Sequence, residues 1–370
     1  MSGEKDRVRW IADHLMSVNR TRSDGELAEL GIGYVAGVSE LDDCSVVSTR
    51  EAVDLVFGAD YVRGPKFHLY EAGYLTNSDI GRFCVTANAS DIAAMGALGV
   101  GFFSIVRYPP EFSDRDFCEV MTGMDEACQQ YGLRLLGGDT GSAERLILSG
   151  FAVGVNRPGK NLLRSRARPG DVVAVTGRVG GAGAAVMASS SELVAQLEAR
   201  VWEELLTSWT GFNAQMEVGR ALAELDIRMS CQDVSDGLRA TAAELARSSG
   251  VGIVLDLERI PLGVGVAEVA NLVGRRPEEL AISASTDFCL CFSCPEEAFG
   301  SVAKAIEKIG AKCYPVGECV EGEGVRTVNE EGALVQAPGV EWNHQSEDIN
   351  VVKSMILKGI SLSAKPSENE

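Results

Sequence analysis

The chain has 370 residues, 45% of them hydrophobic and 24% charged, which is the ordinary mix of a globular protein with room for two domains. Its 53 acidic and 34 basic residues give a formal net charge of −19, so neither nucleic acid nor an anionic membrane is expected as a broad partner. No apolar run approaches the roughly 20 residues that span a bilayer, and no secretory signal opens the chain. We therefore expect a cytoplasmic protein with reduced cysteines.

The first part of the chain predicts a mixture of helices and strands. After a helix and a glycine-rich stretch in residues 1–40, the predicted strands are 44–47, 52–60, 101–107, 133–136 and 146–155. Turn residues predict a loop at 61–80. Small apolar residues predict a buried helix at 80–98, and apolar residues at helical spacing predict another at 114–131, capped by Ser113.

A segment rich in Pro, Gly and Arg, residues 156–171, marks the candidate boundary between two domains. The strands predicted beyond it are 172–176, 252–256, 288–293 and 312–317. The helices predicted there are 180–188, 190–206, 213–225 and 237–248. Because strands and helices do not alternate strictly, two α+β domains fit better than one doubly wound sheet. We predict domains at 1–160 and 161–350, followed by a tail at 351–370.

The ten cysteines include one close cluster, Cys289, Cys291 and Cys294. A metal site there would need a fourth ligand and a supporting loop. The alternative is a buried strand that carries structural thiols. With three histidines in the whole chain, a histidine-rich metal site or a histidine relay is not expected.

Acidic residues at the ends of apolar segments are the main chemical signal. They are Asp42-Asp43, Asp60, Asn88-Ala89-Ser90-Asp91, Gly137-Gly138-Asp139-Thr140 and Asp233-Val234-Ser235-Asp236-Gly237. Each motif alone is also typical of a helix cap or a turn. Together they suit Mg²⁺, which prefers oxygen ligands and would offset the repulsion between carboxylates and phosphate.

A glycine-rich run, Thr176 to Gly183, follows a predicted strand and opens a predicted helix. It either faces an anion with the helix N-terminus or forms a structural turn, and glycine-rich turns alone are weak evidence for the former. The chain contains no G-x-x-x-x-G-K-[ST] string, so a P-loop is excluded.

Four segments carry a family resemblance. They are Asn88-Ala89-Ser90-Asp91-Ile92-Ala93-Ala94-Met95-Gly96-Ala97, Leu136-Gly137-Gly138-Asp139-Thr140, Leu163-Arg164-Ser165-Arg166-Ala167-Arg168-Pro169-Gly170-Asp171 and Asp233-Val234-Ser235-Asp236-Gly237-Leu238. In this order they resemble the motifs of thiamine-monophosphate kinases, in the superfamily of aminoimidazole ribonucleotide synthetase. The resemblance extends over residues 40–345.

The resemblance implies an N-terminal α/β domain, a C-terminal α+β domain and a homodimer in which two N-terminal sheets pair into a barrel. It implies ATP and Mg²⁺ as cofactors and a small-molecule acceptor for the phosphoryl group. The implied metal ligands are Asp42, Asp43, Asp60, Asp91, Asp139, Asp233 and Asp236. Gly138, Thr140 and Ser235 would lie at the nucleotide, and Arg164 would contact phosphate or form a linker salt bridge. If the acceptor is an alcohol, Asp91 or Asp287 is the candidate base.

Three segments depart from the family pattern. The glycine expected directly before Asp42-Asp43 is absent, a glutamate and a histidine are replaced by Arg63 and Lys66, and G-G-E-D-Y-E-L-L reads Ala284-Ser285-Thr286-Asp287-Phe288-Cys289-Leu290-Cys291. The changed segments are those expected around the acceptor. Arg63 and Lys66 either hold an anionic acceptor or are solvated loop charges.

Three functions are therefore compatible with the sequence. The first is thiamine-monophosphate kinase, and the second is a paralogue that phosphorylates or activates another metabolite. The third is a nucleotide-binding regulator without turnover. Retention of the mutually repelling carboxylates argues against the third.

Overall fold

The computed structural model describes residues 31, 33–36, 44–50, 53–62, 67–329, 331–339 and 353. The helix predicted within 1–40 and the site residues Asp42, Asp43, Arg63 and Lys66 lie outside these ranges. The chain forms two compact units. The first comprises Met1–Arg63, Thr76–Leu163 and Ala214–Asp226, and the second comprises Gly64–Leu75, Arg164–Asn213 and Ile227–Glu370. These units are discontinuous in sequence, and the continuous domains given above stay a prediction.

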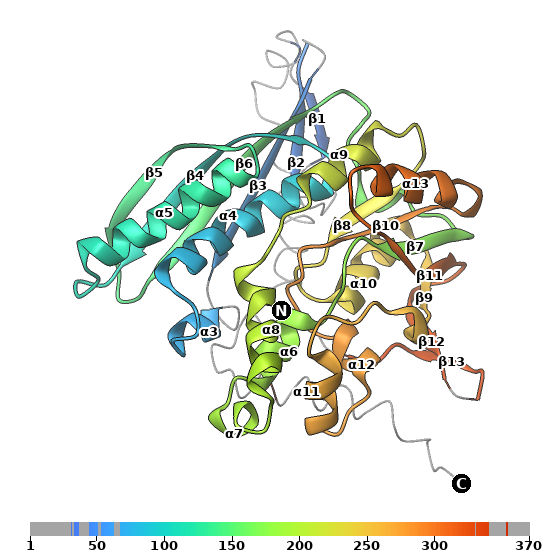
Figure 1. Cartoon of the computed structure of the whole chain (residues 1–370). Helices are drawn as coiled ribbons and strands as arrows, with labels where there is room; N and C mark the ends of the chain where they lie inside the picture. Colours follow the sequence, from blue (N-terminus) through green and yellow to red (C-terminus); the bar gives the residue numbers. More distant parts are fainter. Residues whose placement is uncertain are drawn as a thin grey trace. The chain divides into compact units, whose positions relative to one another are not determined.

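A six-stranded sheet forms the first unit, in the order β1-β2-β3-β6-β4-β5 (Figure 1). Its strands are β1 (Gly33–Ala36), β2 (Ser45–Ser48), β3 (Asp54–Val62), β4 (Leu98–Tyr108), β5 (Arg134–Ser142) and β6 (Ile147–Asn156). Neighbouring strands are antiparallel except for the parallel pair β4 and β5. The connection between that pair runs through a helix, as a parallel crossover requires.

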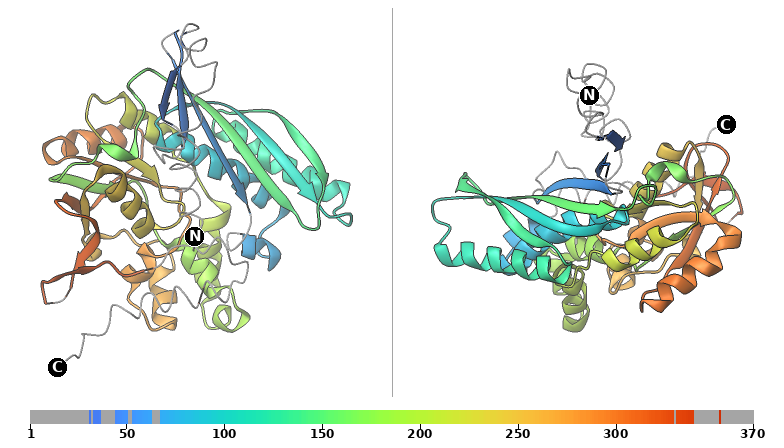
Figure 2. Two further views of the ribbon diagram at one scale, coloured as in Figure 1. Left: turned by 180° about the vertical axis from the view of Figure 1, so that it is seen from behind. Right: turned by 90° about the horizontal axis from the view of Figure 1, so that it is seen from above.

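Helices α4 (Asn77–Ala94) and α5 (Asp114–Gln130) cover one face of this sheet (Figure 2). Each begins with a capping box, formed by Thr76 with Asp79 and by Ser113 with Asp116, so the helix start predicted at Ser113 is confirmed. A shorter helix, α9 (Met216–Glu224), packs against α4.

Two glycines let α4 and α5 approach closely. A Cβ atom on Gly81 would lie 2.1 Å from the backbone oxygen of Val120, and one on Gly123 would lie 2.0 Å from that of Ser78. Both distances are far below van der Waals contact, so a side chain at either position must force the helices apart.

The other face of the sheet is open in the described structure. Large apolar side chains are exposed there, including Tyr61 (51%), Ile105 (46%), Phe103 (40%) and Phe151 (39%). Phe151 stacks with Phe57 and contacts Phe103. The sheet is open rather than closed into a barrel.

A seven-stranded sheet organises the second unit, in the order β13-β12-β9-β11-β7-β10-β8. Its strands are β7 (Asp171–Val175), β8 (Ser230–Asp233), β9 (Gly252–Leu255), β10 (Leu290–Pro295), β11 (Tyr314–Val320), β12 (Gly324–Val328) and β13 (Leu334–Gln336). Only the pair β9 and β12 is parallel. The two units together form the two-domain α+β fold that the sequence predicts.

The described helices of the second unit are α3 (His68–Glu71), α6 (Gly181–Ala188), α7 (Ser191–Val194), α8 (Ala199–Thr210), α10 (Leu238–Ser249), α11 (Val266–Leu272), α12 (Pro277–Ile282) and α13 (Glu296–Lys308), with 3₁₀ turns η2 (Arg164–Arg166) and η3 (Leu257–Arg259). The sequence predicted α6 and α10 but not α3, α11, α12 or α13. The single helix predicted at 190–206 is two helices, α7 and α8. None of the helices in the described ranges has the length and apolar character needed to cross a membrane.

We predict opposite effects for two glycine-to-alanine changes within helices. Gly123→Ala in α5 should lower the free energy of unfolding by about 1–3 kcal/mol, because the methyl group meets the Ser78 carbonyl. Gly300→Ala in α13 should raise it by about 0.5–1 kcal/mol, because no atom lies within 4 Å and alanine favours the helix. Urea unfolding followed by circular dichroism measures both. Equal effects of the two changes would contradict the close helix contact.

Candidate active site

In the first unit, strand β3 and helix α4 bring two of the predicted aspartates to one place. The Asn88 side chain accepts a hydrogen bond from the Asp60 backbone N–H at 3.0 Å and donates to the Cys84 carbonyl at 2.9 Å. One turn later on the helix, Asp91 faces Gly58. A Cβ atom there would lie 3.6 Å from Asp91 Oδ2 and 2.8 Å from Cys44 Sγ. The glycine at 58 therefore leaves room for the Cys44 thiol, while the Asp91 carboxylate lies at ordinary contact distance from the strand that carries Asp60.

Asp139 lies elsewhere on the same sheet. Its carboxylate pairs with Arg107 Nη2 at 2.7 Å, and its side chain is 67% exposed. Arg107 lies two residues after the exposed Ile105 on β4, so both side chains point to the open face of the sheet, and the ion pair lies there. Asp60, in contrast, points toward α4. Three strand spacings, about 14 Å, separate the two positions. Within one chain the structure does not bring Asp139 to Asp60 and Asp91.

Gly138 and Thr140 flank Asp139 on the edge strand β5. A Cβ atom on Gly138 would lie 1.8 Å from the Ser104 carbonyl oxygen, so glycine is needed for β5 to pair with β4 at all. The Thr140 side chain is exposed. This glycine therefore has a packing role that is independent of any nucleotide contact.

In the second unit, the loop after β8 carries Asp233, Ser235 and Asp236. Asp233 is 1% exposed at the end of the strand, and its carbonyl accepts the Thr241 hydroxyl at 3.2 Å. The Ser235 carbonyl accepts the Thr286 hydroxyl at 2.9 Å. Gly237 has a φ of +99°, and a Cβ atom there would lie 2.1 Å from the Ser283 carbonyl oxygen. The Asp-Gly pair thus allows the loop to turn against the segment 283–287.

Asp287 joins that segment to helix α6. Its carboxylate accepts the Gly180 N–H at 2.9 Å and the Ser285 hydroxyl at 2.9 Å, and it also receives the backbone N–H groups of Gly181 and Ala182. The N-terminus of α6 is therefore occupied by a carboxylate of the protein itself. This geometry favours the structural turn over the phosphate loop for the glycine-rich run Thr176 to Gly183.

The pKa of the Asp287 carboxyl group is shifted by its surroundings. Burial raises the pKa of Asp287 to about 6, although the hydrogen bonds from Gly180 and Ser285 oppose the rise. Ser285 also accepts the Gly183 N–H at 2.9 Å. Sequence reasoning singled out the aspartate but missed Ser285 and Thr286. The sequence feature that could have indicated them is the run Ser285-Thr286-Asp287, because short polar side chains commonly form hydrogen bonds with nearby backbone groups.

Arg164 lies in the 3₁₀ turn that opens the second unit. Its carbonyl accepts the Ser249 hydroxyl at 2.7 Å, and the same hydroxyl accepts the Ala167 N–H at 3.0 Å. Nearby, the buried Asp171 carboxylate receives Arg228 through two bonds of 2.6 and 2.7 Å. Asp171, the last residue of the linker motif and the first of β7, is thus fixed by its ion pair with Arg228.

The three clustered cysteines do not converge. Cys291 and Cys294 are buried on β10 at positions of opposite parity, so they face opposite sides of the strand. Burial raises the pKa of Cys294 to about 12 and that of Cys289 well above its usual value. The cluster therefore matches the alternative of structural thiols on a buried strand.

Among the described residues, most of the predicted metal ligands lie in two pairs rather than in one complete metal site. Asp60 with Asp91 and Asp233 with Asp236 supply the oxygen donors that Mg²⁺ prefers, so their chemistry fits that ion. In the described ranges, however, no group of three or more His, Cys, Asp and Glu side chains is arranged to hold a metal. Asp42 and Asp43, outside those ranges, stay predicted ligands.

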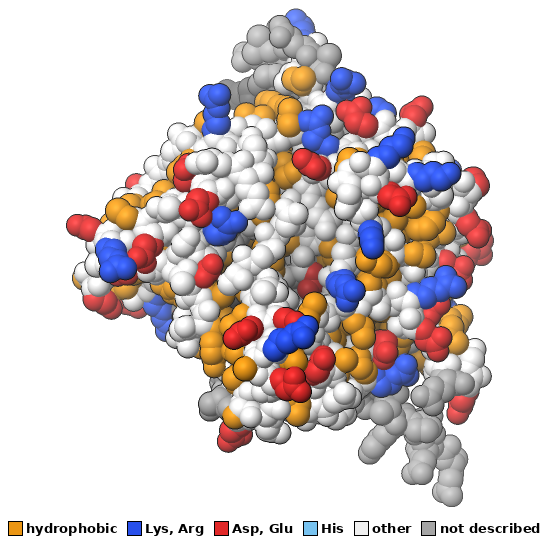
Figure 3. Space-filling view, in the orientation of Figure 1, with side chains coloured by type: hydrophobic (Ala, Val, Ile, Leu, Met, Phe, Trp, Pro, Cys, Tyr) orange, Lys and Arg blue, Asp and Glu red, His pale blue; other side chains and the backbone are white. Residues whose placement is uncertain are grey.

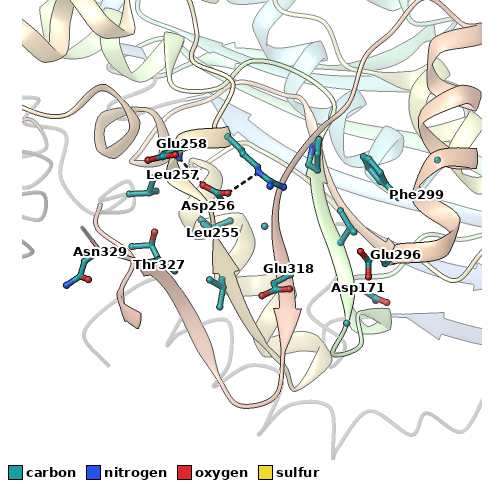
Figure 4. Close-up of a pocket in the computed structure, with 18 of the residues that line it drawn as sticks. Asp171, Leu255, Asp256, Leu257, Glu258, Glu296, Phe299, Glu318, Thr327 and Asn329 are labelled. Carbon is teal, nitrogen blue, oxygen red and sulfur yellow. Dashed lines mark hydrogen bonds and ion pairs between the residues drawn. The ribbon is translucent and has the colours of Figure 1, made fainter. Parts of the chain in front are cut away.

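A pocket of about 890 Å³ lies on the second unit and is lined by Asp171, Asp256, Glu258, Glu296 and Glu318 among others (Figure 4). Asp256 pairs with Arg259 at 3.0 Å across its wall. None of the predicted site residues lines this pocket. Its acidic lining is unsuited to a nucleotide phosphate without cations.

The fold and these motifs define the class of the protein. Residues 41–156 match the family described as AIR synthase related protein, N-terminal domain, and residues 168–329 match its C-terminal domain. The solved structure of AaThiL complexed with AMPPCP and TMP has a TM-score of 0.72 and 23% identity, covering 92% of this chain and 97% of that chain. The aminoimidazole ribonucleotide synthetase-like fold predicted from sequence is therefore confirmed.

The sequence relatives narrow the class to one family. The thiamine-monophosphate kinase of Methanopyrus kandleri is 35% identical over 69% of this chain and 76% of its own length. That of Pyrococcus horikoshii is 31% identical over 73% of this chain and 81% of its own length. The chain belongs to the thiamine-monophosphate kinase family, as a divergent member.

We predict that Asp287 gives the stability a specific pH dependence. Its folded pKa of about 6 lies above the usual 3.8, so between these values the folded state holds a proton that the unfolded state releases. Its contribution is full below pH 3.8 and is lost as the pH rises through 6. Relative to Asp287→Asn, the wild type should lose up to about 3 kcal/mol of unfolding free energy between pH 4 and pH 7.

Thermal unfolding at a series of pH values measures this difference. Glu307→Gln, which removes an exposed carboxylate from α13 of the same unit, is the control and should follow the wild type. A pH-independent gap between wild type and Asp287→Asn would show that the backbone N–H groups stabilise the ionised carboxylate as well as water does.

Proposed function

We propose that this protein is an ATP- and Mg²⁺-dependent phosphotransferase that transfers the γ-phosphoryl group of ATP to thiamine monophosphate. The observation that carries the proposal is the shared family sequence, 35% identical over 76% of the Methanopyrus kandleri kinase. The AaThiL structure, which has the same fold, is complexed with AMPPCP and TMP. Asp91 lies against Gly58 of β3, and Asp60 follows two residues later on the same strand, where its N–H binds Asn88 of α4; this placement supports a site for cationic nucleotide chemistry.

Phosphoryl transfer requires positioning and neutralisation of charge more than covalent chemistry. Bound Mg²⁺ would supply that neutralisation. Asp60 and Asp91 would hold ions on the first unit, and Asp233 and Asp236 on the second, together with the predicted ligands Asp42, Asp43 and Asp139. Gly138, Thr140, Ser235 and Arg164 stay the predicted nucleotide contacts. The oxygen of a phosphate acceptor is already anionic, so no strong base is needed.

The catalytic roles of Asp91 and Asp287 are part of the proposal. Asp91 is partly exposed next to Gly58 and can face a ligand. Asp287 accepts several hydrogen bonds from α6, so its contribution is to fix the segment 283–287 against that helix. If the acceptor is an alcohol, Asp91 and Asp287 both stay predicted bases.

A second candidate function is phosphorylation of a different metabolite. The specific observation is Thr286, which stands where the family motif has glutamate. This side chain is 0% exposed and donates to the Ser235 carbonyl, so it has no carboxylate to offer an acceptor. A changed acceptor would leave the aspartates and the nucleotide chemistry intact.

The active assembly is proposed to be a homodimer. The open face of the six-stranded sheet exposes Tyr61, Phe103, Ile105 and Phe151, and a contiguous apolar face of this kind is costly in water. A second copy of the same sheet would cover it and would close the two sheets into a barrel. This assembly would also bury the Arg107–Asp139 pair, which lies on the same face.

No broad nucleic-acid or membrane surface is proposed. The net charge is −19, and acidic and basic side chains are interspersed over the face that Figure 3 shows. A reducing, cytoplasmic location stays a prediction, compatible with ten cysteines that form no disulfide.

The activity is tested by measuring ADP release with ATP and Mg²⁺, with and without thiamine monophosphate. We expect thiamine diphosphate to form, and Asp91→Asn to lower kcat/KM by about 100-fold or more through loss of a metal ligand. Glu111→Gln, in an exposed turn, is the control and should retain activity. If ATP binds but thiamine monophosphate does nothing, the second candidate replaces the first. Absence of ATP binding would refute both.

The dimer is tested by placing a charge on the open face. Ile105→Glu should shift the sedimentation coefficient from dimer to monomer, because the substitution would bury a carboxylate in the apolar interface. Val264→Glu, at a 43% exposed apolar position of the second unit, should leave the dimer intact. A wild-type protein that sediments as a monomer at micromolar concentration would exclude the proposed barrel.

A further inference from the structure

A cluster of three polar side chains lies in the second unit, at the end of α6 opposite Asp287. His68 Nε2 lies 3.0 Å from Ser189 Oγ, and Lys353 Nζ donates to the same oxygen at 2.9 Å. Ser189 in turn donates to the Val186 carbonyl at 2.7 Å. These groups come from α3, from the residue after α6 and from the C-terminal segment, so the fold brings together residues far apart in sequence.

The hydrogen bonds around Ser189 determine which ring nitrogen of neutral His68 carries the proton. Because the Ser189 hydrogen is directed to Val186, its oxygen can only accept from His68 and Lys353. His68 therefore carries its proton on Nε2 when neutral. The serine is saturated by these three contacts, and the unused capacity of the cluster consists of the His68 Nδ1 atom and two ammonium N–H groups of Lys353.

Lys353 is a cation without a carboxylate partner in the described part of the chain, where Ser189 is its one hydrogen-bond partner. The side chain is half-buried, and burial lowers its pKa. Helix α6, Gly-Ala-Gly-Ala-Ala-Val-Met-Ala, has no charged side chain of its own, and it offers the ammonium group only the negative end of its dipole, at the C-cap Ser189. A partly desolvated ammonium group with open donors is unusual in a chain whose net charge is −19.

His68 responds to the same surroundings. Its pKa is lowered first by burial and then by Lys353, while Glu71 on its own helix opposes the shift. Burial and the neighbouring cation together therefore favour the neutral imidazole. An anion placed against Lys353 would remove that repulsion and favour protonation of Nδ1, which would provide a second charged donor.

We propose that His68, Ser189 and Lys353 form a binding site for a phosphate or phosphate-ester oxyanion. Lys353 supplies the charge, Ser189 holds the lysine and the imidazole in place, and His68 adds a donor by taking up a proton as the ligand binds. Binding should therefore be accompanied by proton uptake at His68, whose pKa should be higher with the anion bound than without it. This site is independent of the proposed kinase activity and of Mg²⁺.

The test uses the full chain without Mg²⁺ or ATP. The Cε1–H signal of His68 is followed by NMR and assigned with His68→Gln, which is practical because the chain has three histidines. Titration with inorganic phosphate should raise the His68 pKa. Lys353→Met should weaken phosphate binding by about 10-fold or more, and Lys304→Met, an exposed lysine on α13, should not.

Further arms separate the alternatives. Lys353→Arg keeps the charge and should keep the phosphate response, which guards against a folding defect in Lys353→Met. A response to thiamine monophosphate but not to inorganic phosphate would support the site and identify an organic phosphate as its ligand. If neither compound moves the His68 pKa, or if Lys353→Met responds like the wild type, the cluster only anchors the C-terminal segment and the proposal is overturned.

Discussion

The second unit depends on one polar junction. The Val234 carbonyl accepts the backbone N–H groups of both Asp287 and Phe288, while the Asp287 carboxylate caps α6. Three segments are thereby joined: the glycine-rich turn, the family motif Asp233 to Gly237, and the segment 283–288, which departs from the family pattern. The junction requires unusual backbone, with φ of +88° at Gly180, +99° at Gly237 and +51° at Phe288. The two glycines adopt such values without strain, whereas a left-handed conformation at Phe288 persists only where surrounding contacts determine it.

The first unit is organised by a different constraint, the close packing of glycine-rich surfaces. Gly81 and Gly123 allow two helices to lie together on one face of the sheet, and Gly138 allows the edge strand to pair. The helix α4 then holds Asn88 and Asp91 over β3, where they meet Asp60 and Gly58. The opposite face is left apolar and exposed, so the same sheet provides both a candidate ligand site and a candidate interface.

The departures from the family pattern acquire a physical meaning in the structure. Ser285 and Thr286 replace Gly and Glu, yet both are buried and both bond within the unit, to Asp287 and to the Ser235 carbonyl. The substitution therefore exchanges a charged group for internal hydrogen bonds and tightens the junction around Asp287. That pattern fits a retained nucleotide site with a changed acceptor environment, which is why two acceptor classes remain in the proposal.

The sequence by itself determined the family, the two-domain α+β class and most of the long elements, because helical periodicity and cap residues act locally, as at Ser113 and α5. It also identified the acidic motifs. Only the tertiary structure decided which of them meet, because strand pairing separates Asp139 from Asp60. It also decided between the two interpretations of the glycine-rich run, because Asp287 caps α6 and favours the structural turn. The contact of His68 with Lys353 through Ser189 was equally invisible, since residues so far apart in sequence converge only through packing.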